Sequence, residues 1–341
     1  MKEILPGIYM MPMALPGFTP DSVNTYIIET PQGLISIDTG MYCPQTIDST
    51  QKQLAEIGAS FSDIKKVLIT HGHVDHMGLV LLLKENYGTR YYLHLKDYEL
   101  GKIRFTDVDN YISLTDVFLK KHGVPAGELP RPEVELTVPP NLFSTKPDIF
   151  LHGGESIRAG RYTLRVINTP GHTMGHVIYY EPNKKFLFSG DMLLPTIATN
   201  PAVHVQHIQN PLKQYIDSLK TMKALDIDLV LPGHESVFSN PYPRIEELIR
   251  DNIKKNEVIR RTFDDRNAKT AYEVSRILAK SARTGESYWD KFAGWDRRFA
   301  VLQSVSYLES LKHDGKLRLE IKDDTYYYLP AELKPPRTNI S

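Results

Sequence analysis

The 341-residue chain has one cysteine, Cys43, which excludes an internal disulfide and any zinc site built from several cysteines. Lysine plus arginine and aspartate plus glutamate both number 41, so the chain as a whole has no net charge to attract nucleic acid or an anionic membrane. No apolar run approaches the length of a membrane span, and residues 1–6 lack the apolar core of a signal peptide. We therefore expect a cytoplasmic protein that binds neither a membrane nor nucleic acid and acts on a small-molecule substrate.

The length of the chain exceeds what one hydrophobic core comfortably serves, which predicts a large domain and a smaller one. We predict a catalytic domain over 1–242, a connecting helix over 243–262 and a C-terminal domain over 263–335. Within the catalytic domain, we predict that 97–150 is a helical and proline-dense insertion near the active site. Apolar, β-branched runs predict strands at 23–28, 34–38, 66–70, 90–95, 149–151, 162–167, 176–180, 185–189 and 229–231, and helical spacing predicts helices at 46–58, 77–86 and 211–225.

The C-terminal segment has the order helix, helix and β-ribbon, with helices predicted over 270–280 and 296–313 and a hairpin over 316–329. This order suggests a winged-helix module. Residues 263–341 hold 14 Lys+Arg and 12 Asp+Glu, a difference of +2, which is too small for the basic stripe of a recognition helix. We therefore expect a structural or dimerising role, in which Trp289, Trp295 and Phe299 anchor this segment to the catalytic domain or to a second subunit. A homodimer is the hypothesis that such anchors favour.

The run His71-Gly72-His73-Val74-Asp75-His76 is the most informative stretch of the sequence. It follows a predicted buried strand at 66–70 and precedes the helix predicted from Met77. A loop with both ends fixed can hold imidazoles and a carboxylate around ions at little ordering cost. We therefore interpret His71, His73, Asp75 and His76 as metal ligands.

Three further candidate ligands follow predicted strands at later positions. They are His172 in Pro170-Gly171-His172, Asp191 in Ser189-Gly190-Asp191 and His234 in Pro232-Gly233-His234. Each has a glycine before it, which lets the backbone approach closely. Seven ligands suit two ions, with His71, His73 and His172 on one ion, Asp75, His76 and His234 on the other, and Asp191 as the bridge.

A nitrogen and oxygen ligand set without thiolate favours two divalent Zn²⁺ ions, with Fe or Mn as alternatives. A bridged pair lowers the pKa of a shared water toward neutrality, so that hydroxide becomes the nucleophile. The same ions stabilise the developing oxyanion. This chemistry predicts a hydrolase, with Asp75, Asp191 and His234 as its catalytic residues.

Together these motifs resemble the metallo-β-lactamase fold superfamily, in the branch that contains glyoxalase II. The resemblance covers roughly residues 1–240 and includes Asp38 in Ile37-Asp38-Thr39-Gly40. It implies an α/β fold, an αβ/βα four-layer sandwich with the site at the edge between two sheets, followed here by the small helical, winged-helix-like domain. It also implies that Asp38 orients the histidine loop from behind the ligands. His204 and His207 lie in the loop after Asp191, which borders the metal site in such relatives. One of them is a candidate substrate contact, and the alternative for each is a solvated loop histidine.

The preferred substrate is an ester-like electrophile: a thioester, a lactone or another carboxylic ester. The alternative within the same superfamily is a metal-dependent phosphodiesterase or ribonuclease, which the near-neutral C-terminal segment disfavours. A flavodiiron-type oxidoreductase is disfavoured because His73 stands where those relatives have glutamate. We read His176, close after His172, as a packed or supporting residue and not as a ligand.

Overall fold

The computed structural model of the protein describes residues 1–16, 20–128, 141–199, 201, 203, 210–280, 287–292 and 294–331. Two compact units emerge from the contacts between residues: unit 1 comprises 1–111, 135–200 and 214–249, and unit 2 comprises 112–134, 201–213 and 250–341. None of the described helices is long and apolar enough to cross a membrane. The domain boundaries predicted from the sequence stay a prediction.

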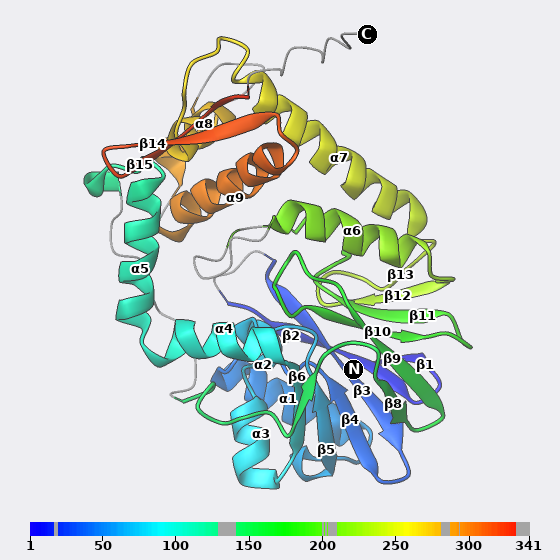
Figure 1. Ribbon diagram of the computed structural model, residues 1–341. Helices are drawn as coiled ribbons and strands as arrows, with labels where there is room; N and C mark the ends of the chain where they lie inside the picture. The colour runs from blue at the N-terminus through cyan, green and yellow to red at the C-terminus, as the bar shows by residue number, and fades with distance from the viewer. Residues whose placement is uncertain are drawn as a thin grey trace. The chain divides into compact units, whose positions relative to one another are not determined.

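The first sheet of unit 1 has seven strands, which follow one another in chain order from β1 to β7 (Figure 1). Pairing is antiparallel from β1 to β4 and parallel from β4 to β7. The strands are β1 (Lys2–Leu5), β2 (Ile8–Ala14), β3 (Ser22–Thr30), β4 (Gly33–Ile37), β5 (Ile64–Leu68), β6 (Arg90–His94) and β7 (Ile149–Leu151).

The second sheet has six strands in the order β13-β12-β11-β10-β9-β8. Its two central strands, β10 and β11, are buried along their whole length, as expected for near-continuous apolar runs covered on both faces. The strands are β8 (Ser156–Ala159), β9 (Tyr162–Asn168), β10 (Val177–Glu181), β11 (Phe186–Gly190), β12 (Leu229–Pro232) and β13 (Phe238–Ser239).

Three apolar clusters make unit 1 a four-layer sandwich. The middle cluster lies between the sheets and includes Ile37, Val166 and Phe188. An outer cluster joins the first sheet to α1 (Pro44–Glu56) and α3 (Val80–Tyr87), and another joins the second sheet to α6 (Pro211–Lys223) and to the start of α7 (Tyr242–Arg261). The predicted αβ/βα sandwich is therefore confirmed.

Unit 2 contains most of α5 (Val108–Lys121), then α8 (Ala271–Leu278), α9 (Gly294–His313) and the hairpin of β14 (Leu317–Lys322) and β15 (Thr325–Pro330). Thr270 and Glu273 form a capping box that begins α8. The predicted helices and hairpin are present, while their interpretation as a winged helix stays a proposal. Short one-turn 3-10 helices lie at Phe61–Asp63, Ala126–Glu128 and Trp289–Lys291.

The tryptophan Trp289 is fully buried within unit 2, where its Nε1 donates to Glu128 Oε2 at 3.2 Å. It thus anchors the segment around Glu128 to the C-terminal part of the same unit. The predicted insertion at 97–150 is helical over α4 (Leu95–Thr106) and α5, and most of its proline-dense part lies outside the described residues.

The histidine run differs in detail from the sequence prediction. The predicted helix over 77–86 is two helices, α2 (Val74–Met77) and α3, so Asp75 and His76 lie on a helical turn and not on a loop. The two helices part near Gly78, where a Cβ would stand 2.3 Å from the backbone nitrogen of Tyr42. This close packing against residues 40–42 places α2 directly behind the ends of β4 and β5.

Candidate metal centre

The seven side chains predicted as ligands all lie beyond the carboxyl ends of strands, at one edge of the sandwich. His71 and His73 follow β5, and α2 carries the next two; His172 follows β9, Asp191 follows β11 and His234 follows β12. They form two groups whose potential ligand atoms lie within 4.8 Å of one another. The groups are His71, His73, His172 and Asp191, and then Asp75, His76 and His234.

In the first group three imidazole nitrogens converge. His73 Nδ1 lies 2.9 Å from His71 Nε2 and 3.1 Å from His172 Nε2. Asp191 Oδ2 lies 3.9 Å from His71 Nε2 and 3.6 Å from His172 Nε2. Ligands of a tetrahedral Zn²⁺ with bonds of 2.0–2.1 Å stand roughly 3.3 Å apart, so the spacing fits a single small cation.

In the second group His234 Nε2 lies 3.5 Å and His76 Nε2 lies 3.6 Å from Asp75 Oδ2. The carboxylate of Asp191 reaches this group too, with Oδ1 3.3 Å from His76 Nε2 and Oδ2 3.4 Å from His234 Nε2. Asp191 therefore contacts residues of both groups.

Two buried atoms that face each other in this cluster have no hydrogen-bond partner: His76 Nε2 and Asp191 Oδ1. A buried polar atom without a partner costs on the order of 1–3 kcal/mol, and more if it is charged. Cations coordinated by these two atoms would remove that cost. The residues present thus fit a pair of divalent metal ions.

The protonation states in the first group suit metal binding, whereas a cation at the second group would have to displace protons. Burial would lower the pKa of His76 and of His234, but Asp191 and Asp75 outweigh it and raise both, that of His234 to about 10. Burial lowers the pKa of His71 and of His73 well below the usual value, so both imidazoles are neutral near pH 7. Burial alone would raise the pKa of Asp75, but His76 and His234 outweigh it and lower the pKa to about 2. Burial likewise opposes ionisation of Asp191, yet the same two histidines hold its pKa well below the usual value. Both carboxylates are therefore ionised.

Asp38 fixes the orientation of two of the histidines. Its Oδ2 accepts a hydrogen bond from His76 Nδ1 at 2.8 Å and another from Thr70 Oγ1 at 2.7 Å. Thr70 Oγ1 in turn lies 3.1 Å from His71 Nδ1. With both Nδ1 atoms donating, the Nε2 atoms of His71 and His76 present their lone pairs to the cluster.

His234 is oriented by the first sheet although it follows a strand of the second. Its Nδ1 donates to the carbonyl oxygen of Ser22 at 2.6 Å, which leaves Nε2 to face the cluster. Asn24 holds the same loop through the carbonyl oxygens of Pro232 and Glu235, at 3.0 and 2.7 Å. Gly233 is required here because a Cβ would lie 2.6 Å from Asp191 Oδ1.

The sequence analysis did not identify Asp97, a fully buried carboxylate in the first turn of α4. Its Oδ2 accepts from the backbone nitrogen of Gly72 and from Thr173 Oγ1, both at 2.7 Å, and its Oδ1 accepts from the backbone nitrogen of Gly175 at 2.6 Å. Asp97 thus ties the loop of His71 and His73 to the loop of His172. The sequence shows only an aspartate near the start of a helix, which is a common arrangement. It therefore gives no specific indication of this role.

His176 is fully buried beside the cluster and supports it without facing it. Its Nδ1 lies 2.8 Å from Thr169 Oγ1, and its Nε2 accepts from the backbone nitrogen of Asp191 at 3.3 Å. This agrees with its interpretation as a supporting residue. The two predicted substrate contacts, His204 and His207, lie outside the described residues.

This chain belongs to the metallo-beta-lactamase superfamily, whose family model matches residues 18–234. A solved structure of a metallo-beta-lactamase family protein from Thermus thermophilus superposes with a TM-score of 0.80 at 27% identity, covering 96% of this chain and all of that one. The "Probable metallo-hydrolase YqjP" of Bacillus subtilis is 26% identical over 76% of this chain and 82% of its own length.

Relatives named for ester chemistry also match. The "Atrochrysone carboxyl ACP thioesterase" of Aspergillus fumigatus is 23% identical over 90% of this chain and 61% of its own. The "Hydroxyacylglutathione hydrolase GloC" of Haemophilus influenzae is 26% identical over 38% of this chain and half of its own. The activities in these names are consistent with a metal-dependent hydrolase.

Proposed function

We propose that this protein is a binuclear metal-dependent hydrolase of the glyoxalase II-like branch that acts on a thioester or another carboxylic ester, lactones included. One observation carries the proposal: the carboxylate of Asp191 contacts residues of two adjacent ligand groups, at 3.3–3.9 Å. A carboxylate so placed can bridge two ions, which a mononuclear site would not require.

His71, His73 and His172 would hold one ion, and Asp75, His76 and His234 the other, with Asp191 between them. The set contains no thiolate, because Cys43 is buried next to Thr46 and is not part of either group. Zn²⁺ is therefore favoured, with Fe or Mn as alternatives. When bound, such a pair supplies Lewis acidity and a water whose pKa is lowered toward neutrality.

The chain itself contributes orientation, charge and access. Asp38 and Ser22 hold the imidazoles of His76 and His234 with Nε2 toward the cluster. Asp75 has a quarter of its side chain exposed, whereas His76 and His234 are buried, so within this group Asp75 is the residue most accessible to a substrate. Asp75 and Asp191 are ionised, so either can accept a proton released during hydrolysis.

The ester class is supported by the two relatives named as a thioesterase and as a hydroxyacylglutathione hydrolase. The alternative remains a metal-dependent phosphodiesterase or ribonuclease of the same superfamily. Both hypotheses use the same metal ligands. Measurements of substrate turnover can therefore distinguish them, whereas measurements of metal binding cannot.

The test is a comparison of initial rates for a thioester, a lactone and a phosphodiester, using metal-loaded protein of measured metal content. Asp191→Asn is the site variant, and His152→Gln, an exposed histidine outside both groups, is the matched control. We expect turnover of the thioester or lactone, unchanged by the control and reduced on the order of a thousandfold or more in Asp191→Asn.

If the protein hydrolyses only the phosphodiester, the proposed ester hydrolase is wrong and the phosphodiesterase or ribonuclease hypothesis replaces it. Full activity in a metal-replete Asp191→Asn protein would overturn the binuclear proposal itself. Loss of one of two bound ions in that variant, together with loss of turnover, is the expected combination.

A further inference from the structure

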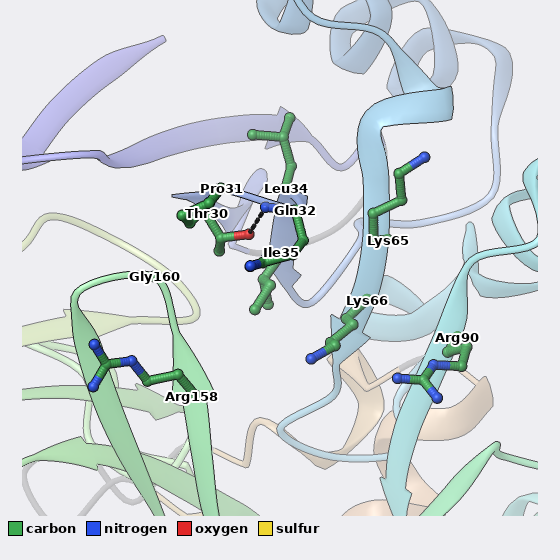
Figure 2. A pocket seen from close by; sticks show the side chains of 10 residues that line it. All are labelled: Thr30, Pro31, Gln32, Leu34, Ile35, Lys65, Lys66, Arg90, Arg158 and Gly160. Carbon is green, nitrogen blue, oxygen red and sulfur yellow. Dashed lines mark hydrogen bonds between the residues drawn. The ribbon is translucent and has the colours of Figure 1, made fainter.

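A hollow of about 610 Å³ lies between the β3–β4 turn, the first residues of β5 and β6, and the β8–β9 hairpin (Figure 2). The candidate metal ligands follow the other ends of β5 and β9, so the hollow and the metal centre lie at opposite ends of the sandwich. Its volume falls within the range of pockets that bind small organic ligands. The lining consists of Thr30, Pro31, Gln32, Leu34, Ile35, Lys65, Lys66, Arg90, Arg158 and Gly160.

Four of these ten residues are cationic and none is acidic. Figure 2 shows the side chains of Lys66 and Arg90 extending in the same direction from neighbouring strands, whereas the guanidinium of Arg158, on the β8–β9 hairpin, points away from them. Among the described residues, none of these three has an ion-pair partner. Lys65, at the rim, donates to the carbonyl oxygen of Ser62 at 2.7 Å.

Lys66 and Arg90 are direct partners in the parallel pairing of β5 and β6. Like charges at paired positions on one face of a sheet repel each other. Two residues further along the strands, the same face carries Leu68 and Tyr92, which pack in the apolar cluster between the sheets. Lys66 is half-buried and Arg90 is exposed, so the two charges lie at the open end of this face.

Charges that point inward often protect the edge of a sheet from pairing with another chain. That explanation does not apply to β5 and β6, which are interior strands with neighbours on both sides. The repulsion between Lys66 and Arg90 is thus a cost that an anion in the hollow would remove.

The hollow is preformed and separate from the metal centre. Gly160 has φ +60°, and a Cβ there would lie 2.5 Å from the carbonyl oxygen of Glu29, so the β8–β9 turn is held tightly against β3. Five residues of extended chain, about 17 Å, separate Lys66 from His71. The apolar core between the sheets, including Leu68 and Val166, fills the space between the two ends.

We propose that this hollow is a second ligand site, which binds a small phosphate-bearing anion of nucleoside-diphosphate size. The guanidinium of Arg90 can bind phosphate oxygens in pairs, and Lys66 adds a point charge from the neighbouring strand. Pro31, Leu34 and Ile35 supply an apolar wall for an organic moiety. The concave shape suits a compact ligand and not an extended nucleic-acid strand. The inference does not depend on the reaction proposed for the metal centre.

The test is calorimetric titration of the metal-loaded protein with ADP, and separately with a single-stranded RNA oligonucleotide, at low ionic strength. The main variant is Lys66→Gln/Arg90→Gln, and Arg158→Gln removes a charge from the other sheet. Lys52→Gln/Lys102→Gln is the matched control, because it removes the same charge from exposed positions on α1 and α4.

We expect ADP to bind the wild type and the control equally, and to bind Lys66→Gln/Arg90→Gln at least tenfold more weakly, with Arg158→Gln between them. Hydrolytic turnover should be the same in all of these proteins. ADP should also raise the melting temperature of the wild type but not that of the double variant. Three results would each overturn the proposal. They are a wild type that does not bind ADP, equal ADP affinity in the wild type and both pocket variants, and binding of the oligonucleotide but not of ADP.

Discussion

The carboxylate of Asp97 accepts a hydrogen bond from the backbone nitrogen of Gly175 at 2.6 Å, and the two residues belong to segments 78 positions apart. The same carboxylate holds Gly72 and Thr173. The two loops that carry the three histidines of the first ligand group are thus joined through one buried side chain, which belongs to neither group.

Replacement of Asp97 by asparagine should weaken metal binding while leaving the fold intact. Both oxygens of Asp97 accept hydrogen bonds, from Gly72 and Thr173 or from Gly175. The NH₂ group of asparagine would replace one of these oxygens, and it cannot accept a hydrogen bond from the donor that it faces. We expect metal affinity to fall about 10- to 100-fold, as for other residues that orient ligands, measured by competition with a chromophoric chelator. Glu99→Gln, exposed on the same helix, is the control. Wild-type affinity in Asp97→Asn would show that the loops hold their positions without it.

Asp38→Asn should affect the two ions unequally. Asparagine tolerates the positive φ of 57° at this position, but its NH₂ group cannot accept from His76 Nδ1. His76 would then carry its proton on Nε2, the atom that faces the cluster. After dialysis against buffer of low free metal concentration, we expect elemental analysis to find close to one ion per chain, against two in the wild type and in the exposed control Asp48→Asn. Two tightly held ions in Asp38→Asn would contradict this orientation role.

Removal of the metal should destabilise unit 1, because it leaves the buried atoms of His76 and Asp191 without partners. Ligands that bind only the folded state stabilise it in proportion to the logarithm of their concentration over Kd. Dialysis against a strong chelator should therefore lower the melting temperature by several degrees, and added Zn²⁺ should restore it. An identical melting curve before and after chelation, with metal loss verified, would exclude a stabilising site.

Acid should destabilise unit 2 through His122. Its ring is buried at 4.5 and 5.1 Å from the rings of Phe118 and Tyr326, and this burial lowers its pKa to about 3. The unfolded chain takes up a proton near pH 6.5 and the folded chain does not, so stability falls as the pH drops from about 6.5 toward 3. Between pH 7.5 and pH 5 the loss is about 2 kcal/mol.

Urea unfolding followed by tryptophan fluorescence measures this loss, because both tryptophans of the chain, Trp289 and Trp295, belong to unit 2. His122→Leu should remove most of the pH dependence, whereas His313→Gln, with an exposed side chain, should keep it. The same pH dependence in His122→Leu and wild type would assign the effect to other groups.

The sequence predicted those parts of the site that come from local pattern. His71, His73, Asp75 and His76 share one short run, and His172, Asp191 and His234 each follow a recognisable strand, so strand order was enough to bring them to one edge. Ligand roles for these residues remain a proposal, but the convergence of all seven is a feature of the structure.

Residues that act through the backbone of distant segments could not be predicted in this way. Asp97 bonds to partners 25, 76 and 78 positions away, and no motif records such contacts. The sequence predicted one helix over 77–86 where the structure has α2 and α3, and the reason for this error is similar. The division depends on the approach of Gly78 to the backbone of Tyr42, and the helical periodicity of 77–86 continues across it.

The ligand set draws on both sheets, with His71, His73, Asp75 and His76 beyond the first and His172, Asp191 and His234 beyond the second. Translation proceeds from the N-terminus, so the first four emerge long before His234 does. An ion captured early would therefore meet an incomplete and differently shaped set of donors. With these seven residues as ligands, the complete centre would form only after the sandwich has closed, which would place correct metal loading late in the folding of unit 1.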